Sequence, residues 1–185
     1  MLRRRGSAMN NDHTVVNIVV AGLGGTGVIR ASDMLAEAAF LAGYDIKKSE
    51  IHGMSQRGGS VSSDVRYGPK VYSPMVPAGE ADFLMVLHPE EVETNAGRLR
   101  EGGVLITPQV LLGDRTELKA LDEDDGTPVN QRNYNVCMLG LLSTYLDIGE
   151  EYWRTAIFSN LPKKVHEQNQ GVFEYGRILR EKMPK

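Results

Sequence analysis

The sequence contains a single cysteine, Cys137, among its 185 residues. One thiol excludes a disulfide framework within the chain, and it excludes the multi-cysteine ligand sets of zinc knuckles and iron–sulfur clusters. Cys137 lies in the apolar segment 135–140, which is typical of a helix, so we expect a buried and unreactive thiol. Low cysteine usage fits a reducing cytoplasm, which is the compartment that we predict.

The sequence also has no surplus of positive charge and no long hydrophobic run. The net charge of −3 predicts no nucleic-acid partner. Apolar runs never approach the ~18 residues of a membrane span, so no membrane partner is predicted either. Polar residues, not the apolar stretch of a signal peptide, follow Arg3-Arg4-Arg5. We predict a disordered tail over residues 1–13 and a single globular domain over residues 14–185.

The pattern of metal-binding residue types is equally sparse. His13, His88 and His166 share no metal-ligand spacing with one another or with the cysteine. The acidic stretch 122–126 lacks the spacing of a calcium-binding loop, and a solvated turn is the better interpretation. No metal site is therefore predicted.

A glycine-rich turn follows the first apolar run. Residues 15–21 predict a buried strand, and the periodicity of residues 28–42 predicts a helix that ends at Gly43. Between them the sequence reads Gly-Leu-Gly-Gly-Thr-Gly, a G-x-G-x-x-G motif in its strand-to-helix setting. Glycine amides and a helix N-terminus can hold a phosphate there. The candidate cofactor-binding residues are Gly22, Gly24, Gly25 and Gly27.

Glu50 lies near the end of the next predicted strand, residues 44–51, where dinucleotide-binding proteins carry a ribose-binding acid. A stand-alone Rossmann-type dinucleotide-binding protein is therefore one hypothesis for this chain. Against it, no pair of side chains suited to nicotinamide chemistry can be recognised downstream.

The segment 50–61 carries more polar chemistry than a turn requires. A structural turn needs one or two residues that tolerate positive φ, whereas this segment combines three glycines with imidazole, guanidinium, amide and hydroxyl groups. Arg57 could donate paired hydrogen bonds to a carboxylate or a phosphate. The candidate active-site or interface residues are His52, Gly53, Met54, Ser55, Gln56, Arg57, Gly58 and Gly59.

Other interpretations of this loop stay open. A hydrolase nucleophile at Ser55 is disfavoured, because Arg57 occupies the second glycine position of G-x-S-x-G. His52 could act as a base, but histidines in such loops more often hydrogen-bond to the backbone or to a partner chain. An ordinary solvated loop is the remaining alternative.

The residues after this loop predict more strands. Alternation over 61–67, a turn at Gly68-Pro69 and a return at 71–72 predict a β-hairpin. Apolar runs predict strands over 81–87 and 104–107. A helix is expected to begin near Pro89, and a turn is expected at Gly102-Gly103, before the second of these strands.

The C-terminal part predicts helices. An apolar helix begins near Asn135, a second covers 150–161, and Pro162 opens a final one. The residues of the second helix expected in the core are Trp153, Ile157 and Phe158. The predicted fold class is α/β: a Rossmann-like, three-layer open sheet with helices on both faces, an inserted β-hairpin and a helical C-terminal part.

The segment 52–61, HGMSQRGGSV, resembles a loop of the gamma-type subunit or domain of 2-oxoacid:ferredoxin oxidoreductases. Within that family it is most similar to the small (beta) subunit of indolepyruvate ferredoxin oxidoreductase. Segments 73–77, 135–140 and 169–176 also resemble family motifs. The chain departs from the family in having Thr26 where glutamine is usual, and in a shortened segment over 108–130.

This resemblance implies a small subunit that is inactive alone. A larger partner subunit would hold thiamine diphosphate, Mg²⁺ and the iron–sulfur clusters. The complex would convert an aryl 2-oxoacid such as indolepyruvate, with coenzyme A and oxidised ferredoxin, to an acyl-CoA, carbon dioxide and reduced ferredoxin. The loop 52–59 would lie near the interface with the larger subunit, and the family's glycine turn need not bind NAD.

Overall fold

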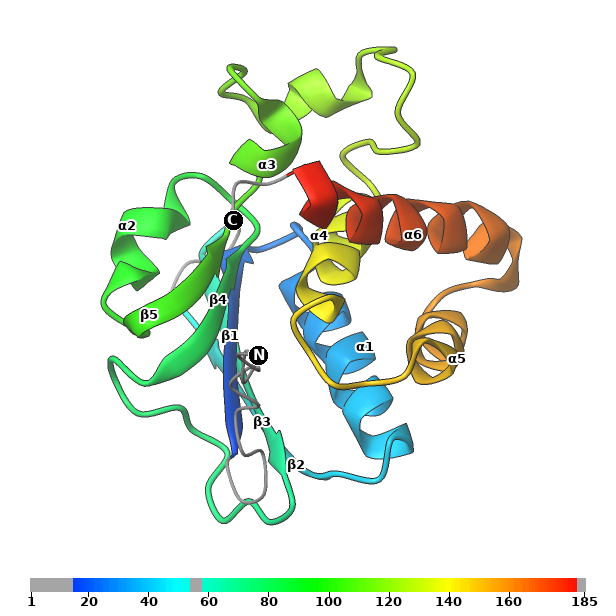
Figure 1. Cartoon of the computed structure of the whole chain (residues 1–185). Helices are drawn as coiled ribbons and strands as arrows, with labels where there is room; N and C mark the ends of the chain where they lie inside the picture. Colours follow the sequence, from blue (N-terminus) through cyan, green and yellow to red (C-terminus); the bar gives the residue numbers. More distant parts are fainter. Residues whose placement is uncertain (1–14, 54–57, 183–185) are drawn as a thin grey trace, which may run out of the picture.

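A computed structural model of the chain describes residues 15–53 and 58–182; the predicted tail lies outside these ranges. One sheet of five strands forms the centre: β1 (Val16–Leu23), β2 (Asp45–His52), β3 (Ser60–Gly68), β4 (Ala81–Val86) and β5 (Leu99–Ile106). The strand order is β2-β3-β1-β4-β5 (Figure 1). β1, β4 and β5 are parallel, whereas β3 is antiparallel to both of its neighbours.

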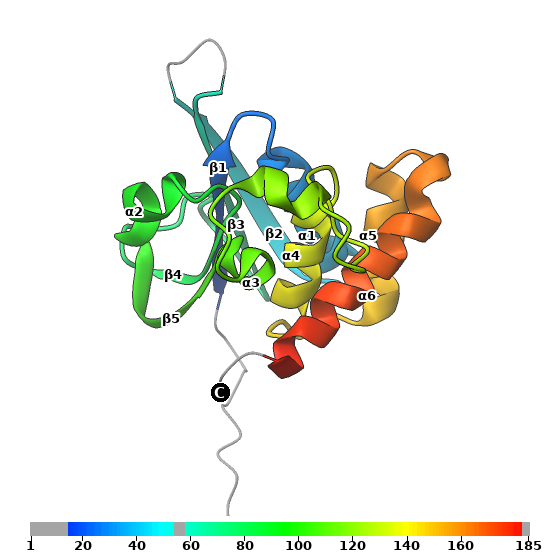
Figure 2. The same ribbon diagram turned by 90° about the horizontal axis from the view of Figure 1, so that it is seen from above.

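Helices lie on both faces of this sheet, which confirms the predicted three-layer α/β fold (Figures 1 and 2). One face carries α1 (Val28–Leu41), α4 (Tyr134–Ser143), α5 (Glu150–Asn160) and α6 (His166–Lys182). Among the described residues, the other face carries only the short α2 (Glu91–Ala96). Within the segment 108–130 lie α3 (Gln109–Leu112) and the 3-10 helix η1 (Leu118–Asp122). None of the helices described is long and apolar enough to cross a membrane.

The hairpin of the sheet is not the predicted one. β2 and β3 form it, with a register that runs from Asp45 opposite Gly68 to His52 opposite Val61. The predicted return strand at 71–72 is wrong. The Val71 amide donates to Asp45 Oδ2 (2.9 Å), so it is not available to a strand, and its side chain is buried. β3 therefore lies between β1 and β2, which are connected through α1 without being neighbours.

The turn predicted at Gly102-Gly103 is also wrong, because both glycines lie inside β5. The ladder between β4 and β5 is irregular at this point: Ala81 pairs with Leu99 and Phe83 pairs with Val104. Gly102 has φ of 72°, a value that glycine adopts at little cost. The glycine pair thus produces a bulge in a continuing strand and does not reverse the chain.

Helix α4 is buried along its whole length. A helix that is apolar on all sides belongs in a protein interior. α6 packs against it through Gly140 and Gly176, where an added Cβ would overlap the backbone of the facing helix. Cys137 lies in this contact, and burial raises the pKa of its thiol to about 12. The prediction of a buried thiol is confirmed.

The two remaining C-terminal helices agree closely with the expected pattern. Trp153 and Ile157 of α5 are buried, as predicted, while Phe158 is half-buried and stacks on His166 with 4.4 Å between ring centroids. The final helix begins at His166 and not at Pro162. A 3-10 turn, η2 (Lys163–Val165), comes first.

A buried ion pair secures the sparsely covered face of the sheet. The carboxylate of Asp64, on β3, is 1% exposed and accepts two hydrogen bonds from Arg98 Nη2 (2.7 and 2.8 Å). It also accepts the Val76 amide at 2.8 Å. Because Val76 packs into the small apolar cluster of this face, these bonds hold segment 71–80 over the sheet where no helix covers it.

Candidate functional site

Three segments meet where β1, β2 and β4 end, beside the start of α1 (Figure 2). They are the glycine turn after β1, the loop between β2 and β3, and Leu87-His88 after β4. The Leu87 amide donates to Ala21 O at 2.7 Å, which brings the third segment against β1. We refer to this region as the carboxyl edge of the sheet. The turn glycines and the described ends of the loop 52–59, both of which the sequence singled out, lie in this region.

The loop between β2 and β3 contacts the glycine turn through its backbone. Gly24 N donates to Gly59 O at 2.9 Å, and Gly53 N donates to Ser60 O at 2.7 Å. A Cβ added to Gly24 would come within 3.5 Å of the Gly58 backbone. Met54, Ser55, Gln56 and Arg57 lie outside the described residues. The structure thus places the two ends of the loop, and a Cβ at Gly24 would make only an ordinary van der Waals contact with it.

Gly22 and Gly27 of the turn are packed against the protein's own side chains, whereas a Cβ on Gly25 would have nothing within 4 Å. A Cβ on Gly22 would lie 2.7 Å from Thr26 Oγ1 and 3.2 Å from Leu87 Cβ. Gly27 has φ of 87°, and a Cβ there would overlap Asn135 Nδ2. The space on the Cβ side of Gly22 and Gly27 is therefore occupied by the chain itself, and the Gly24 amide is already bonded to Gly59 O.

Glu50 does not join the glycine turn. Its carboxylate accepts a hydrogen bond from Lys48 Nζ (2.6 Å) and lies 3.5 Å from His52 Nε2. The hydrogen bond from Lys48 is the main reason that the pKa of Glu50 is lowered. Lys48 also bridges to Asp33 of α1. Because the Glu50 carboxylate is paired with Lys48 and His52 and does not face the glycine turn, the stand-alone dinucleotide-binding hypothesis is not favoured.

A hollow of about 420 Å³ remains between the glycine turn, the first turn of α1 and the end of β2. Gly24, Gly25, Gly27 and His52 line it, together with Arg30. Gly22 and Glu50 are not part of this lining. The structure therefore brings His52 and three of the four turn glycines together, and the guanidinium of Arg30 lies beside them.

The base of the loop is anchored by residues that sequence reasoning missed. Ser60 Oγ donates to Glu91 Oε2 at 2.7 Å, and Asn95 Nδ2 donates to the same oxygen at 3.2 Å. Both α2 residues are buried. The sequence indicated only that Glu91 suits the first turn of a helix. Nothing in it linked Glu91 to Ser60, 31 residues earlier.

Two residues at the start of α4 were missed as well. The Tyr134 hydroxyl donates to Leu87 O at 2.7 Å, and burial raises its pKa to about 12. Asn135 Nδ2 lies 3.4 Å from Gly27 O. The only signal in the sequence was the resemblance of segment 135–140 to a family motif. It did not reveal that α4 supports the glycine turn.

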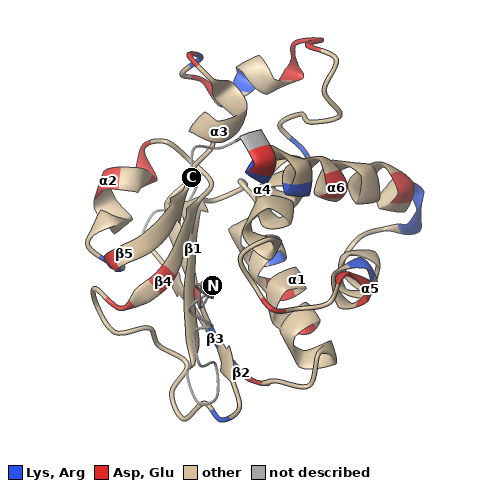
Figure 3. Cartoon of the chain, viewed as in Figure 1, with Lys and Arg blue, Asp and Glu red and all other residues tan. Residues whose placement is uncertain are grey.

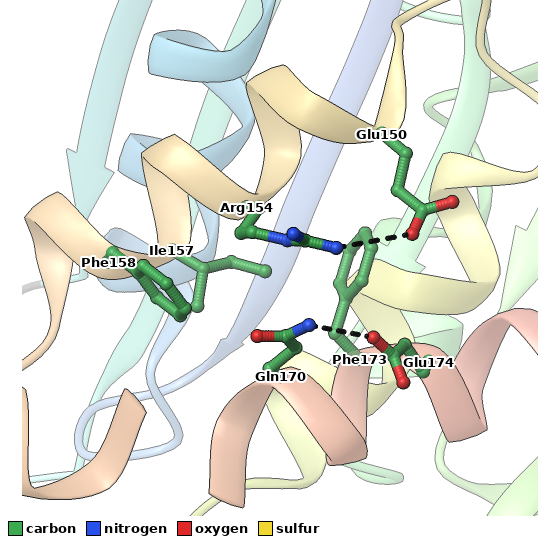
Figure 4. A pocket seen from close by; sticks show the side chains of 7 residues that line it. All are labelled: Glu150, Arg154, Ile157, Phe158, Gln170, Phe173 and Glu174. Atoms are coloured by element: carbon green, nitrogen blue, oxygen red, sulfur yellow. Dashed lines mark hydrogen bonds and ion pairs between the residues drawn. The ribbon is translucent and has the colours of Figure 1, made fainter. Parts of the chain in front are cut away.

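The helical side of the molecule offers no comparable site among the residues described. Acidic and basic residues are interspersed along α5 and α6 (Figure 3). Between these helices lies a hollow of only about 10 Å³. Glu150 and Arg154 (4.0 Å) pair along α5 on one wall, and Gln170 and Glu174 (3.0 Å) pair along α6 on the other (Figure 4). It holds no more than a water molecule.

The fold and the carboxyl edge define a Rossmann-like α/β protein whose glycine turn is packed against a loop and a helix of its own chain. The chain belongs to the pyruvate ferredoxin/flavodoxin oxidoreductase family, whose model matches residues 17–178. This match confirms the family resemblance carried by residues 52–61.

The relatives support this placement over nearly the whole chain. Indolepyruvate oxidoreductase subunit IorB of Thermococcus kodakarensis is 34% identical over 188 residues, which cover 86% of this chain and 93% of the relative. The IorB subunit of Pyrococcus horikoshii is 32% identical with the same coverage.

Two solved structures share the fold. The gamma subunit of a keto/oxoacid ferredoxin oxidoreductase from Geobacter sulfurreducens has a TM-score of 0.73 at 24% identity and covers 91% of this chain and 99% of that one. A 2-oxoglutarate:ferredoxin oxidoreductase from Magnetococcus marinus, solved with 2-oxoglutarate, coenzyme A and succinyl-CoA bound, has a TM-score of 0.74 at 21% identity. The match covers 94% of this chain but 32% of that longer chain.

Proposed function

We propose that this chain is the small subunit of a thiamine-diphosphate-dependent oxidoreductase that oxidatively decarboxylates indolepyruvate or another aryl pyruvate. The products are an acyl-CoA, carbon dioxide and reduced ferredoxin. The observation that carries the proposal is the end-to-end similarity to subunits named for indolepyruvate, at 32–34% identity and 93% of their length. The gamma-type fold supports the same assignment.

In this proposal the demanding chemistry belongs to a larger partner subunit. That subunit holds thiamine diphosphate, Mg²⁺ and the iron–sulfur clusters, coenzyme A is the co-substrate, and ferredoxin accepts the electrons. The single buried cysteine supports this division, because an iron–sulfur cluster needs several accessible thiolates. The reducing cytoplasm is the proposed compartment.

The contribution proposed for this chain is the loop 52–59, presented to the partner at the carboxyl edge. The support is that hydrogen bonds hold the base of the loop. The Gly24 amide donates to Gly59 O, and Ser60 Oγ donates to the buried Glu91. A loop held at its base on strands and helices can place one side chain accurately. We assign that role to Arg57, and His52, at the end of β2, is the second candidate.

The test is to co-express the chain with its larger partner and measure CoA-dependent ferredoxin reduction with indolepyruvate, pyruvate and 2-oxoglutarate. We expect a brown complex that turns over indolepyruvate fastest and a lone chain that is colourless and inactive. A complex that prefers pyruvate would contradict the aryl assignment. Failure of the chain to enter any iron–sulfur complex would contradict the subunit assignment.

The role of the loop needs its own variant. Arg57→Ala should lower turnover by about tenfold or more while the complex stays assembled, because a guanidinium bound to a carboxylate or phosphate contributes about 1.5–3 kcal/mol. Arg154→Ala, on the surface of α5, is the matched control and should leave turnover unchanged. Unchanged turnover in Arg57→Ala would show that the loop serves assembly alone.

A further inference from the structure

A hollow of about 670 Å³ lies at the opposite edge of the sheet, where β1 and β4 begin and β3 ends. We refer to this region as the amino edge. The volume falls within the range of pockets that hold small organic ligands. None of the residues 52–59 lines it, so it is separate from the candidate site at the carboxyl edge.

Two pairs of aromatic rings line this hollow. Tyr44 and Tyr67 have ring centroids 5.0 Å apart, and Phe83 and Tyr145 have centroids 5.8 Å apart. Tyr67 and Phe83 stand on strands to either side of β1, which contributes Val16 to the lining. The pairs are therefore positioned as two aromatic walls that could hold a flat ligand between them.

One polar group in these walls has no bonding partner. Tyr67 is 3% exposed and lines the hollow, yet among the described residues its hydroxyl makes no hydrogen bond. The Tyr44 hydroxyl, by contrast, donates to Asp147 O at 3.0 Å. In the described part of the chain, the solvent-excluded polar side-chain atoms without a partner are Ser63 Oγ and Trp153 Nε1, so the Tyr67 oxygen opens onto the hollow, where a ligand's polar group can take the place of water.

The charges around the hollow are predominantly negative. Three carboxylates line it, on Glu80, Asp82 and Asp147, against one guanidinium, on Arg100, which is paired with Asp82 at 2.7 Å. Burial first, and then nearby groups that include Asp147 and Asp82, raise the pKa of Tyr67. The guanidinium of Arg180 is a second positive charge and occupies the Tyr145 ring, 4.6 Å from its centroid, but Glu80 and Asp147 have no ion-pair partner among the described residues. These surroundings favour a positively charged ligand.

We propose that the amino-edge hollow binds a small organic cation, a protonated amine carried on an aryl body. The ammonium group donates to the Tyr67 hydroxyl oxygen and lies in the field of Asp147, while the aryl body packs between the two aromatic pairs. This inference is independent of the proposed oxidoreductase function, because it uses none of the residues of the carboxyl edge.

The test is calorimetric titration of the full chain with tryptamine, which combines a primary ammonium with a flat aromatic body. We expect saturable binding that weakens as ionic strength rises. Tyr67→Phe keeps the ring and should weaken binding by about tenfold, since a hydrogen bond to a charged group is lost. Asp147→Asn should also weaken it. Tyr72→Phe, at a tyrosine that is 88% exposed, is the matched control.

Indole-3-propionate provides the decisive comparison, because it has the same ring system with a carboxylate in place of the ammonium. It should bind at least about tenfold more weakly than tryptamine if charge selects the ligand. Equal binding of the two compounds would overturn the proposal, as would equal affinity in Tyr67→Phe and the unaltered chain. Absence of tryptamine binding at about 1 mM would overturn it as well.

Discussion

At the carboxyl edge of the sheet the close contacts are made by glycines and backbone groups, whereas at the amino edge they are made by aromatic side chains. The Gly24 amide donates to the loop at Gly59 O, and the side chain of Asn135 packs against Gly27. Tyr67 and Phe83, on strands flanking β1, stand over an open volume. Both edges leave a hollow, of about 420 Å³ at the carboxyl edge and about 670 Å³ at the amino edge, but the first is bounded mainly by glycines and backbone and the second by aromatic rings.

This difference shows what a glycine motif can and cannot indicate. The G-x-G-x-x-G pattern predicts only that something approaches the backbone closely after β1. In this chain the approaching groups are the backbone of Gly59 and the side chain of Asn135. At Gly22 and Gly27 the motif coincides with tight internal packing, and substitutions at the two edges should have different consequences.

The largest effect is expected from Gly27→Ala. The substitution places a Cβ at positive φ and onto Asn135 Nδ2, so the free energy of unfolding should fall by about 2–4 kcal/mol in urea denaturation. Gly25→Ala is the matched control: its φ is 92°, but an added Cβ has nothing within 4 Å, so only about 1 kcal/mol should be lost.

A double variant separates strain from overlap at Gly27. Asn135→Ala removes the group that the new Cβ would meet, so adding it to Gly27→Ala should cost less than the sum of the two single substitutions by about 1 kcal/mol. Strict additivity, or equal losses for Gly25→Ala and Gly27→Ala, would mean that the carboxyl edge is more loosely filled than its contacts indicate.

Ser60→Ala should have the next largest effect. It leaves Glu91 Oε2 buried with the Asn95 amide but without its 2.7 Å donor, which should lower the free energy of unfolding by about 2 kcal/mol. Ser159→Ala, where the hydroxyl donates to Glu37 on the surface, should cost less than about 0.5 kcal/mol. A similar loss at both serines would show that Glu91 does not depend on the loop.

A matched pair of tyrosines compares the two edges directly. Tyr134→Phe removes a buried hydrogen bond to Leu87 O at the carboxyl edge and should cost about 1–1.5 kcal/mol in thermal or urea unfolding. Tyr67→Phe removes a hydroxyl that bonds to no described residue, so the change should be within about 0.5 kcal/mol. A large loss at Tyr67 would imply that the amino edge is not open.

The sequence was sufficient for those features whose signals are local. The strand before Gly22, the helix that ends before Gly43 and the buried helix around Cys137 all follow from short-range patterns. The predictions failed where one distant contact decided the outcome. Asp45 captures the Val71 amide, and so the return strand expected at 71–72 does not form.

The two edges were predictable to different degrees for the same reason. The loop 52–59 carries its distinctive residues in one continuous segment, so the sequence alone was enough to recognise it. Asn135 supports Gly27 from 108 residues away, and nothing in either sequence context links them. The aromatic walls require β3 to lie between β1 and β2, an arrangement that the predicted strand, helix and strand of residues 15–51 do not reveal.

The smallest effect, a dependence on pH, tests whether charge contributes to the carboxyl edge. The hydrogen bond from Lys48 lowers the folded-state pKa of Glu50, so its stabilisation is present above the unfolded pKa of about 4.3 and is lost as pH falls through the folded-state value. Because the pair is near the surface, Glu50→Gln should cost only about 0.5 kcal/mol at neutral pH. It should also make the free energy of unfolding less dependent on pH below about pH 4.5.

The control is Glu93→Gln, at an exposed position of α2, which should leave the pH dependence of the free energy of unfolding unchanged. A loss of several kcal/mol in Glu50→Gln would show that ion pairs, and not backbone contacts, hold the end of β2 in place.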